Sequence, residues 1–302
     1  MGSLKGIRTR ILSVKAMRRI TESVQVMAMA RFRKAQLAVD SAKPYLSGLV
    51  SSLDRVLSAG YKKREKVPVL LIGRDQVEVH LLIICTGDRG LCGGFNSSAV
   101  RAVQARVKEL YSQGKKIRII CVGRKGFQTL RNRFSGEILD HVRLEEVRES
   151  GFECAEVIGK KVLDLFDRGD VDAVTLFYSK PHGIAQQSLI IQDLIPWSHP
   201  AISQGNEEEE QELESKGHVV YEGTRENIVR ELLIHNVSVQ IFNAMLDSVA
   251  AFYGAQVMSM DNATRNADDM IKRMTIHYNR SRQAAVTQEL IEVIAGAEVV
   301  LS

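Results

Sequence analysis

Apolar residues near both ends of the chain recur every three or four positions, the spacing of an amphipathic helix. The N-terminal stripe comprises Leu4, Ile7, Ile11, Val14, Met17, Ile20, Val24 and Met27, and it resumes with Ala35, Ala38, Ala42, Tyr45, Leu49, Leu53 and Val56. We predict one helix over residues 1–59, roughly 80 Å long at ~1.5 Å per residue. Pro44 removes a backbone donor inside it, and we expect a kink there.

The C-terminal segment, residues 224–302, shows the same period and contains no proline. Thr224 is a suitable N-cap, and Glu226 lies in the first turn, where the helix dipole favours an acidic side chain. The segment therefore predicts a second helix, of roughly 75 residues and roughly 110 Å.

The middle of the chain, residues 67–203, has a different pattern. Short apolar runs bounded by turn residues are typical of buried strands, and four are present: Val77–Cys85, Ile117–Val122, Val171–Tyr178 and Ser188–Ile195. Between them we predict a helix capped by Asn96 or Ser97 that ends near Gln113. Another begins with the capping box Ser150–Glu153 and ends before Gly169. Strands alternating with helices indicate an α/β domain with a mostly parallel sheet.

The two terminal helices decide the fold class. A compact chain of this mass is only roughly 40–45 Å across, so neither helix can be hidden inside it. Each has a narrow apolar stripe that needs a partner. We expect α/β plus a long α-helical coiled coil: antiparallel N- and C-terminal helices protrude from a central Rossmann-like α/β domain. An acidic block at 207–214, inside residues 204–223, is expected to be a solvated loop.

Charge is distributed unevenly. Residues 1–64 hold 14 Lys/Arg and three acidic residues, which gives this segment a net charge of +11. The rest of the chain has a net charge of −6, so the whole chain has +5. A basic arm predicts an anionic partner, so a nucleic-acid-binding coiled-coil protein is one alternative. No apolar run approaches the ~18 residues of a membrane helix, and the N-terminus does not resemble a secretory signal. The four cysteines form no C-x-x-C pair, a reduced, intracellular pattern without a metal site.

Candidate chemistry is sparse. The glycine-rich stretch Thr86–Asn96 follows a predicted strand, but it matches neither a Walker A loop nor G-x-G-x-x-G, and Gly123–Gly126 is equally loose. A tight structural turn is the better interpretation, and a nucleotide-binding enzyme built on the α/β domain is the alternative. The seven histidines form no dyad with a nucleophile. We therefore expect no catalytic residues, no cofactor and no metal.

Three blocks resemble the gamma subunit of the F-type ATP synthase. The first runs from Ile7 to Gln36, and the second is Asp88–Gly94 with Asn96. The third is Met260–Ala267, followed by Tyr278-Asn279, Arg282-Gln283-Ala284 and Thr287-Gln288-Glu289-Leu290. Their order and spacing cover essentially the whole chain.

The resemblance implies a non-catalytic central rotor. It transmits rotation of a membrane c ring to a catalytic hexamer of alpha and beta subunits, during proton-driven ATP synthesis or ATP hydrolysis. The implied partners are the alpha and beta subunits, the epsilon subunit and the c ring, with no nucleic acid. The complex would place the chain peripherally on the cytoplasmic face of a bacterial plasma membrane, or on the matrix side of the mitochondrial inner membrane.

The resemblance also implies three sets of contact residues. Contacts that couple the shaft to alpha and beta are assigned to Arg8, Val24, Arg282, Gln283, Thr287 and Glu289; the family usually has Met where Val24 stands. An apolar tip in a bearing is assigned to Ala297, Val299, Val300 and Leu301. Foot contacts with the c ring and epsilon are assigned to Pro44, Tyr45, Leu46 and Tyr221.

Overall fold

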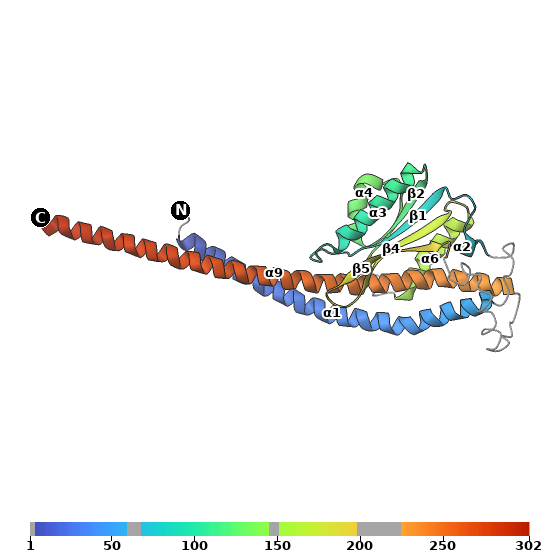
Figure 1. Ribbon diagram of the computed structural model, residues 1–302, viewed down its shortest axis with the longest axis horizontal. Helices are drawn as coiled ribbons and strands as arrows, with labels where there is room; N and C mark the ends of the chain where they lie inside the picture. Colours follow the sequence, from blue (N-terminus) through green and yellow to red (C-terminus); the bar gives the residue numbers. More distant parts are fainter. Residues whose placement is uncertain (1–3, 59–67, 145–150, 198–224, 302) are drawn as a thin grey trace. The chain divides into compact units, whose positions relative to one another are not determined.

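The computed structural model describes residues 4–58, 68–144, 151–197 and 225–301, with only the backbone at 57–58, 225–227 and 295–301 (Figure 1). The chain divides into two compact units. The paired-helix unit consists of residues 1–28 and 257–302, and the sheet unit consists of residues 29–256. Two long helices, α1 (Leu4–Ser58) and α9 (Arg225–Leu301), run through both units. Their extents confirm the two predicted terminal helices, and α1 continues through Pro44.

The paired-helix unit is an antiparallel pair. Arg18 contacts Asp268, Thr21 contacts Thr264 and Gln25 contacts Asp261, so partners on α9 fall in number as positions on α1 rise. The antiparallel pairing of the terminal helices is thereby confirmed.

The face of α1 that packs on α9 differs from the predicted stripe. Leu4, Ile7, Ile11 and Val14 are half-buried as expected. Beyond Val14, the predicted members Met17, Ile20 and Met27 are 59%, 63% and 52% exposed. The inward positions are instead Arg18, Thr21, Gln25 and the buried Ala28. The prediction was wrong at Met17, Ile20 and Met27, because it followed hydrophobicity alone on a helix whose face toward α9 is mostly polar there; the predicted Val24 is half-buried.

The sheet unit contains one five-stranded sheet in the order β3-β2-β1-β4-β5. Its strands are β1 (Val79–Cys85), β2 (Lys116–Val122), β3 (Ile138–Val142), β4 (Ala173–Pro181) and β5 (Gln187–Ile195). The pairs β1–β2, β2–β3 and β1–β4 are parallel, and β4–β5 is antiparallel. The mostly parallel sheet is confirmed. Strand β3 was not predicted, since its sequence ILDHV is half-buried throughout and has no continuous apolar run.

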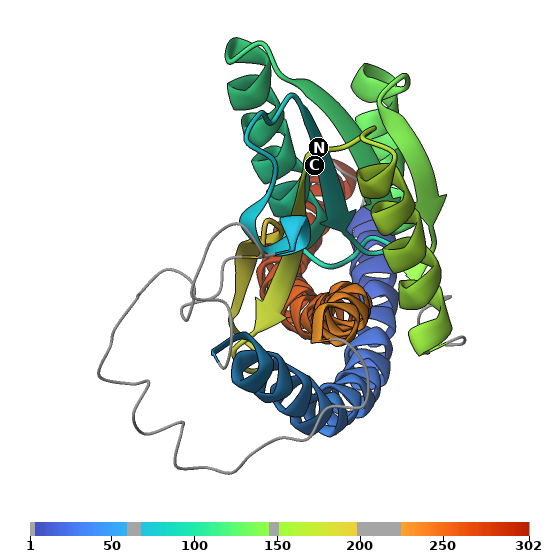
Figure 2. The same cartoon turned by 90° about the vertical axis from the view of Figure 1, so that its right-hand side faces the viewer.

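Helices cover both faces of this sheet. Alternate residues of β1 point to opposite faces: Leu82 and Ile84 pack with α3 (Phe95–Ser112) and α4 (Arg124–Phe134). Leu81 and Ile83 pack with α6 (Phe152–Asp167) and with the stretch of α9 before residue 257. In Figures 1 and 2 this orange stretch of α9 lies beside the strands, with α1 on its other side. Phe32 and Val39 of α1 join the same core, so parts of both long helices belong to it.

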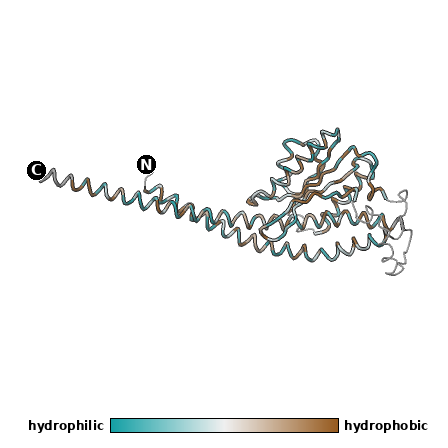
Figure 3. The backbone as a smooth tube through the Cα atoms, viewed as in Figure 1, coloured by the Kyte–Doolittle hydropathy of each residue, from teal (hydrophilic) through white to brown (hydrophobic). Residues whose placement is uncertain are grey.

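The beginnings of two helices differ from the predicted caps. Helix α3 begins after Gly94 and α6 after Gly151, and neither has a side-chain cap. Asn96 and Ser97 therefore do not cap α3, because both already lie within its first turn. A short helix, α2 (Val69–Ile72), packs with Leu53 and Trp197 in a separate small cluster. Figure 3 shows the hydrophobic colour concentrated on the strands.

Candidate interaction surfaces

The glycine-rich loop after β1 closes on itself and on the turn before α4. Asn96 Oδ1 accepts a hydrogen bond from the Gly87 amide (2.8 Å). Asp88 Oδ1 accepts one from the Arg124 amide (2.8 Å), and Thr86 Oγ1 accepts one from the Gly126 amide (3.0 Å). Backbone amides at a helix N-terminus are the groups that would hold a phosphate. Here the chain's own side chains occupy them.

Close packing explains the glycines of this region. A Cβ on Gly87 would lie 2.6 Å from ring atoms of Phe252 on α9. A Cβ on Gly123, whose φ is +100°, would lie 1.9 Å from the Thr86 carbonyl oxygen. Both values are far inside van der Waals contact, so only glycine fits without rearrangement. These glycines allow segments to approach closely, as a tight structural turn requires.

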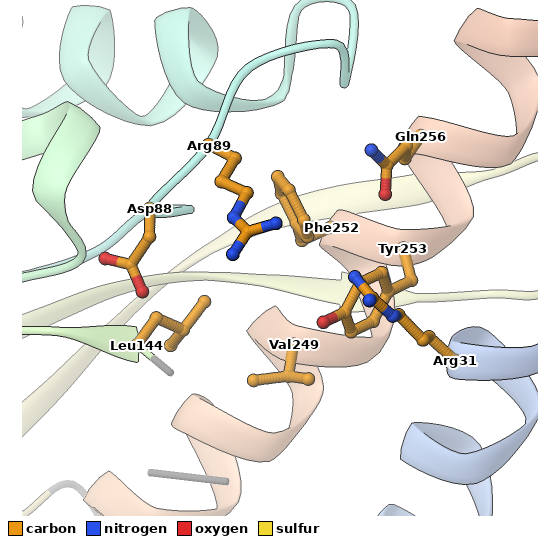
Figure 4. A pocket seen from close by; sticks show the side chains of 8 residues that line it. All are labelled: Arg31, Asp88, Arg89, Leu144, Val249, Phe252, Tyr253 and Gln256. Atoms are coloured by element: carbon orange, nitrogen blue, oxygen red, sulfur yellow. The ribbon is translucent and has the colours of Figure 1, made fainter. Parts of the chain in front are cut away.

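Phe252 also occupies the crevice in which doubly wound sheets bind ligands. That crevice lies beyond the carboxyl ends of the strands where the strand order reverses, here between β1 and β4. The remaining cavity has a volume of about 60 Å³, whereas ligand pockets are typically ~300–1,000 Å³. Figure 4 shows its lining: Arg31, Asp88, Arg89, Leu144, Val249, Phe252, Tyr253 and Gln256. A nucleotide does not fit in this space.

The residues assigned to coupling lie mainly on the surface of the paired-helix unit. Arg8, Arg282, Gln283 and Glu289 are exposed, and Val24 is half-buried. Thr287 is also exposed, and its hydroxyl donates to the Gln283 carbonyl oxygen of its own helix (2.9 Å). The four α9 residues therefore present their polar groups outward on one stretch of helix. The tip residues Ala297, Val299, Val300 and Leu301 lie outside the described side chains.

Large apolar side chains are exposed on both helices of this unit. Many large apolar side chains are 47–70% exposed in the described part of the unit. They are Leu12, Met17, Ile20, Val26 and Met27 on α1, and Met270, Ile276, Val286, Leu290, Ile291, Val293 and Ile294 on α9. Contiguous exposed apolar patches are typical of contact surfaces, whereas single exposed apolar residues are common on any protein surface. Exposed basic residues lie among them on α1, including Arg8, Arg10, Lys15 and Arg19.

The foot residues lie beside an apolar groove in the sheet unit. Pro44 and Tyr45 are exposed, and Leu46 is half-buried. The Tyr45 hydroxyl lies 2.6 Å from Nε2 of His235 on α9. The groove has a volume of about 340 Å³ and is lined by Ala42, Tyr45, Leu46, Phe152, His235, Val239, Phe242 and Asn243. The fourth foot residue, Tyr221, and the acidic block at 207–214 lie outside the described residues.

A buried carboxyl group was missed by sequence reasoning. Asp247 of α9 is only 3% exposed. Burial raises its pKa to about 6, although the positive charges of Lys180, Lys43 and His182 act in the opposite direction. Nothing in the sequence around Asp247 distinguishes it from the exposed acids on α9. Among the described residues, no cluster of His, Cys, Asp and Glu could hold a metal ion.

Comparison with known proteins decides the family. A protein-family model described as "ATP synthase" matches residues 3–300. The ATP synthase gamma chain of Rhodopseudomonas palustris (strain TIE-1) is 45% identical over 99% of this chain and 100% of the relative. That of Sinorhizobium medicae is 44% identical over 99% of each chain. The chain belongs to the ATP synthase gamma chain family. The resemblance stated from the sequence is confirmed, and the nucleic-acid-binding alternative finds no support in these comparisons.

Solved structures agree with the fold of the gamma-chain family. A rotor chain of the Euglena gracilis mitochondrial ATP synthase has a TM-score of 0.63 at 17% identity, covering 94% of this chain and 99% of that one. A chain of the Tetrahymena thermophila central stalk and c ring has a TM-score of 0.60 at 21% identity, covering 81% and 99%. No helix within the described ranges is both long and apolar enough to cross a bilayer.

The third block that resembles the gamma-chain family, Met260–Ala267, contributes to the seam between α1 and α9. From this block, Asp261 and Thr264 face Gln25 and Thr21. Arg265 forms an ion pair with Asp261 on its own helix (2.7 Å). The block thus joins the two helices, whereas the four coupling residues assigned to α9, Arg282, Gln283, Thr287 and Glu289, lie further along that helix and are exposed.

Proposed function

We propose that this chain is the central rotor of its ATP synthase and transmits rotation of the c ring to the alpha/beta hexamer. The observation that carries the proposal is the apolar exterior of the paired-helix unit in a member of the gamma-chain family. Surrounding protein would cover these apolar side chains. Apolar walls around the helix pair would let it rotate with few specific contacts. The E. gracilis rotor and the T. thermophila central stalk, which share the fold, support this role.

The chain acts on catalysis as an asymmetric ligand in this proposal. A ligand shifts a conformational equilibrium only as far as its contacts differ between the two states. A helix pair whose faces differ in charge and polarity offers each beta subunit a different contact at each angle. The chain itself supplies no catalytic group, and the loop after β1 has no room for a nucleotide.

Arg282, Gln283 and Thr287 are the proposed coupling contacts on α9. They are exposed, so their replacement leaves the packing of this chain unchanged. We expect R282A/Q283L to lower ATP-driven proton pumping by the reconstituted complex roughly tenfold, the effect of losing about 1.4 kcal/mol of differential contact. The matched control is D269N/K272Q, which removes an exposed pair on the same helix. Normal pumping by R282A/Q283L would contradict the assignment.

Pro44, Tyr45 and Leu46 are the proposed foot contacts with epsilon and the c ring. Their support is position: Tyr45 and Leu46 line an apolar groove that the described residues leave open, and Pro44 precedes them on α1. We also propose a peripheral location on the cytoplasmic side of a bacterial membrane, held there through the complex. Copurification of the full chain with a three-plus-three hexamer, epsilon and the c ring tests the association that both proposals require, and Tyr45→Glu should release epsilon or the ring.

The isolated chain should hydrolyse no ATP, and this separates a rotor from a nucleotide-binding enzyme. The assay is phosphate release by the purified chain, compared with release after alpha and beta are added. Robust hydrolysis by the chain alone would overturn the proposal. Calorimetry with ATP checks the same point, and no heat of binding is expected.

A further inference from the structure

The seam between α1 and α9 contains three consecutive polar layers. Arg18 Nε donates to Asp268 Oδ1 at 2.6 Å, and the hydroxyls of Thr21 and Thr264 are 2.8 Å apart. Gln25 Nε2 donates to Asp261 Oδ1 at 3.2 Å. All six side chains are half-buried. Inward positions of a coiled coil are normally apolar. These three layers therefore bury less apolar surface than a usual coiled-coil seam would.

Apolar side chains that could have filled the seam lie next to it and face outward. Each is adjacent in sequence to an inward residue: Met17 beside Arg18, Ile20 beside Thr21, and Met27 beside Ala28. Helix α1 therefore carries two candidate seams over residues 17–28. One is polar and faces α9, and the other is apolar and, apart from the half-buried Val24, exposed.

Geometry alone does not reject the apolar seam. The inward positions Val14, Arg18, Thr21, Gln25 and Ala28 keep the alternating steps of four and three that a left-handed supercoil requires. The apolar alternative, from Val14 through Met17, Ile20, Val24 and Met27, contains one extra step of three, which coiled coils accommodate by local overwinding. A further interaction has to decide between them.

We propose that Asp261, Thr264 and Asp268 of α9 select the face of α1 that packs against them, and so hold Met17, Ile20 and Met27 outward. An apolar face of α1 placed there would leave Asp261, Thr264 and Asp268 without their partners on α1, although Asp261 would keep its ion pair with Arg265 of its own helix. To the extent that such a pair is shielded from water, removing one partner costs more than replacing both with apolar groups. The polar layers therefore act as specificity elements. This inference concerns pairing within the chain and does not depend on the rotor role.

The experiment reads the facing of α1 through thiol labelling of the full-length chain. In a C154S background the remaining native cysteines are buried. Met27→Cys reports the exposed face and Ala28→Cys the buried face, in separate proteins. With a maleimide reagent, residue 27 should react at least roughly tenfold faster than residue 28, because labelling of a buried thiol needs local opening.

The decisive variant makes only the α9 side apolar: D261L/T264V/D268L. The apolar stripe of α1 then becomes the better partner, and the ratio of the two labelling rates should fall to about one or invert. The six-fold variant that also carries R18L/T21V/Q25L restores a matched seam, and it should recover the parental ratio. D269N/K272Q, an exposed pair on α9, should leave the ratio unchanged. An unchanged ratio in the α9-only variant, with helicity retained by circular dichroism, overturns the proposal.

If the α9-only variant loses helicity, a charge swap between Arg18 and Asp268 tests the same proposal. Arg18→Asp places two carboxylates face to face and should lower the labelling ratio, and R18D/D268R should restore it. If the swap leaves the ratio as low as Arg18→Asp does, the polar pairing does not select the face.

Discussion

Asp247 makes a sharp prediction about stability and pH. In the folded chain burial raises its pKa to about 6 from the ordinary 3.8. The folded state therefore holds this proton at pH values where the unfolded chain has released it. By linkage, stability from this group is present below about pH 4, falls as pH rises through the window from 4 to 6, and is lost above it. The full difference is about 3 kcal/mol, from about two pKa units at 1.36 kcal/mol each.

The assay compares urea unfolding of the parent and of Asp247→Asn between pH 4 and pH 7.5. Because other groups titrate in both proteins, the informative quantity is the difference between their free energies of unfolding. We expect Asp247→Asn to gain up to about 3 kcal/mol relative to the parent as pH rises through this window. Asp269→Asn removes an exposed carboxylate from the same helix and serves as the matched control. A difference between parent and Asp247→Asn that does not vary with pH would refute the reasoning.

Three further predictions follow from packing and exposure. Gly87→Ala should destabilise the chain by about 1–3 kcal/mol through overpacking against Phe252. In thermal unfolding, Gly87→Ala/Phe252→Leu should recover part of this loss. An unaltered melting temperature in Gly87→Ala would contradict the close approach. Cys154, the half-buried cysteine, should be the first native thiol to react with a maleimide, and the three buried thiols should react only on unfolding. Mass spectrometry of the partly labelled chain identifies the site. Tyr45→Phe removes the hydroxyl beside His235, and because Tyr45 is largely exposed, the loss by urea unfolding should stay below about 1 kcal/mol.

The long-range architecture could be predicted from the sequence because it follows from length and period. Two helices that exceed the diameter of a globule must pair, and four apolar runs alternating with helices form a mostly parallel sheet. Strand β3 was not predicted because all five of its residues are half-buried and two of them, Asp140 and His141, are polar. The cap of α3 was misplaced because the Asn96 side chain accepts a hydrogen bond from the Gly87 amide and not from an amide of α3.

The candidate site was harder to predict, for a physical reason. The apolar stripe of α1 was followed correctly as far as Val14 and then onto Met17, since hydrophobicity is a property of one helix. Which side of α1 packs inward depends on both helices, and Asp268, the α9 partner of Arg18, lies 250 positions away in the sequence. The exposure of Arg282 and Gln283 agrees with their assignment as contact residues, and it does not by itself identify what they contact.

The packing of Phe252 against Gly87 makes α9 an intramolecular ligand of the sheet. Where a doubly wound fold would release and rebind a nucleotide, this sheet holds a helix of its own chain, at the high effective concentration that a covalent connection gives. A fragment of residues 68–197 would therefore expose an unfilled crevice and an uncovered sheet face. Such a fragment should capture a separate peptide of residues 225–256, and the two pieces together would reconstitute the core by complementation.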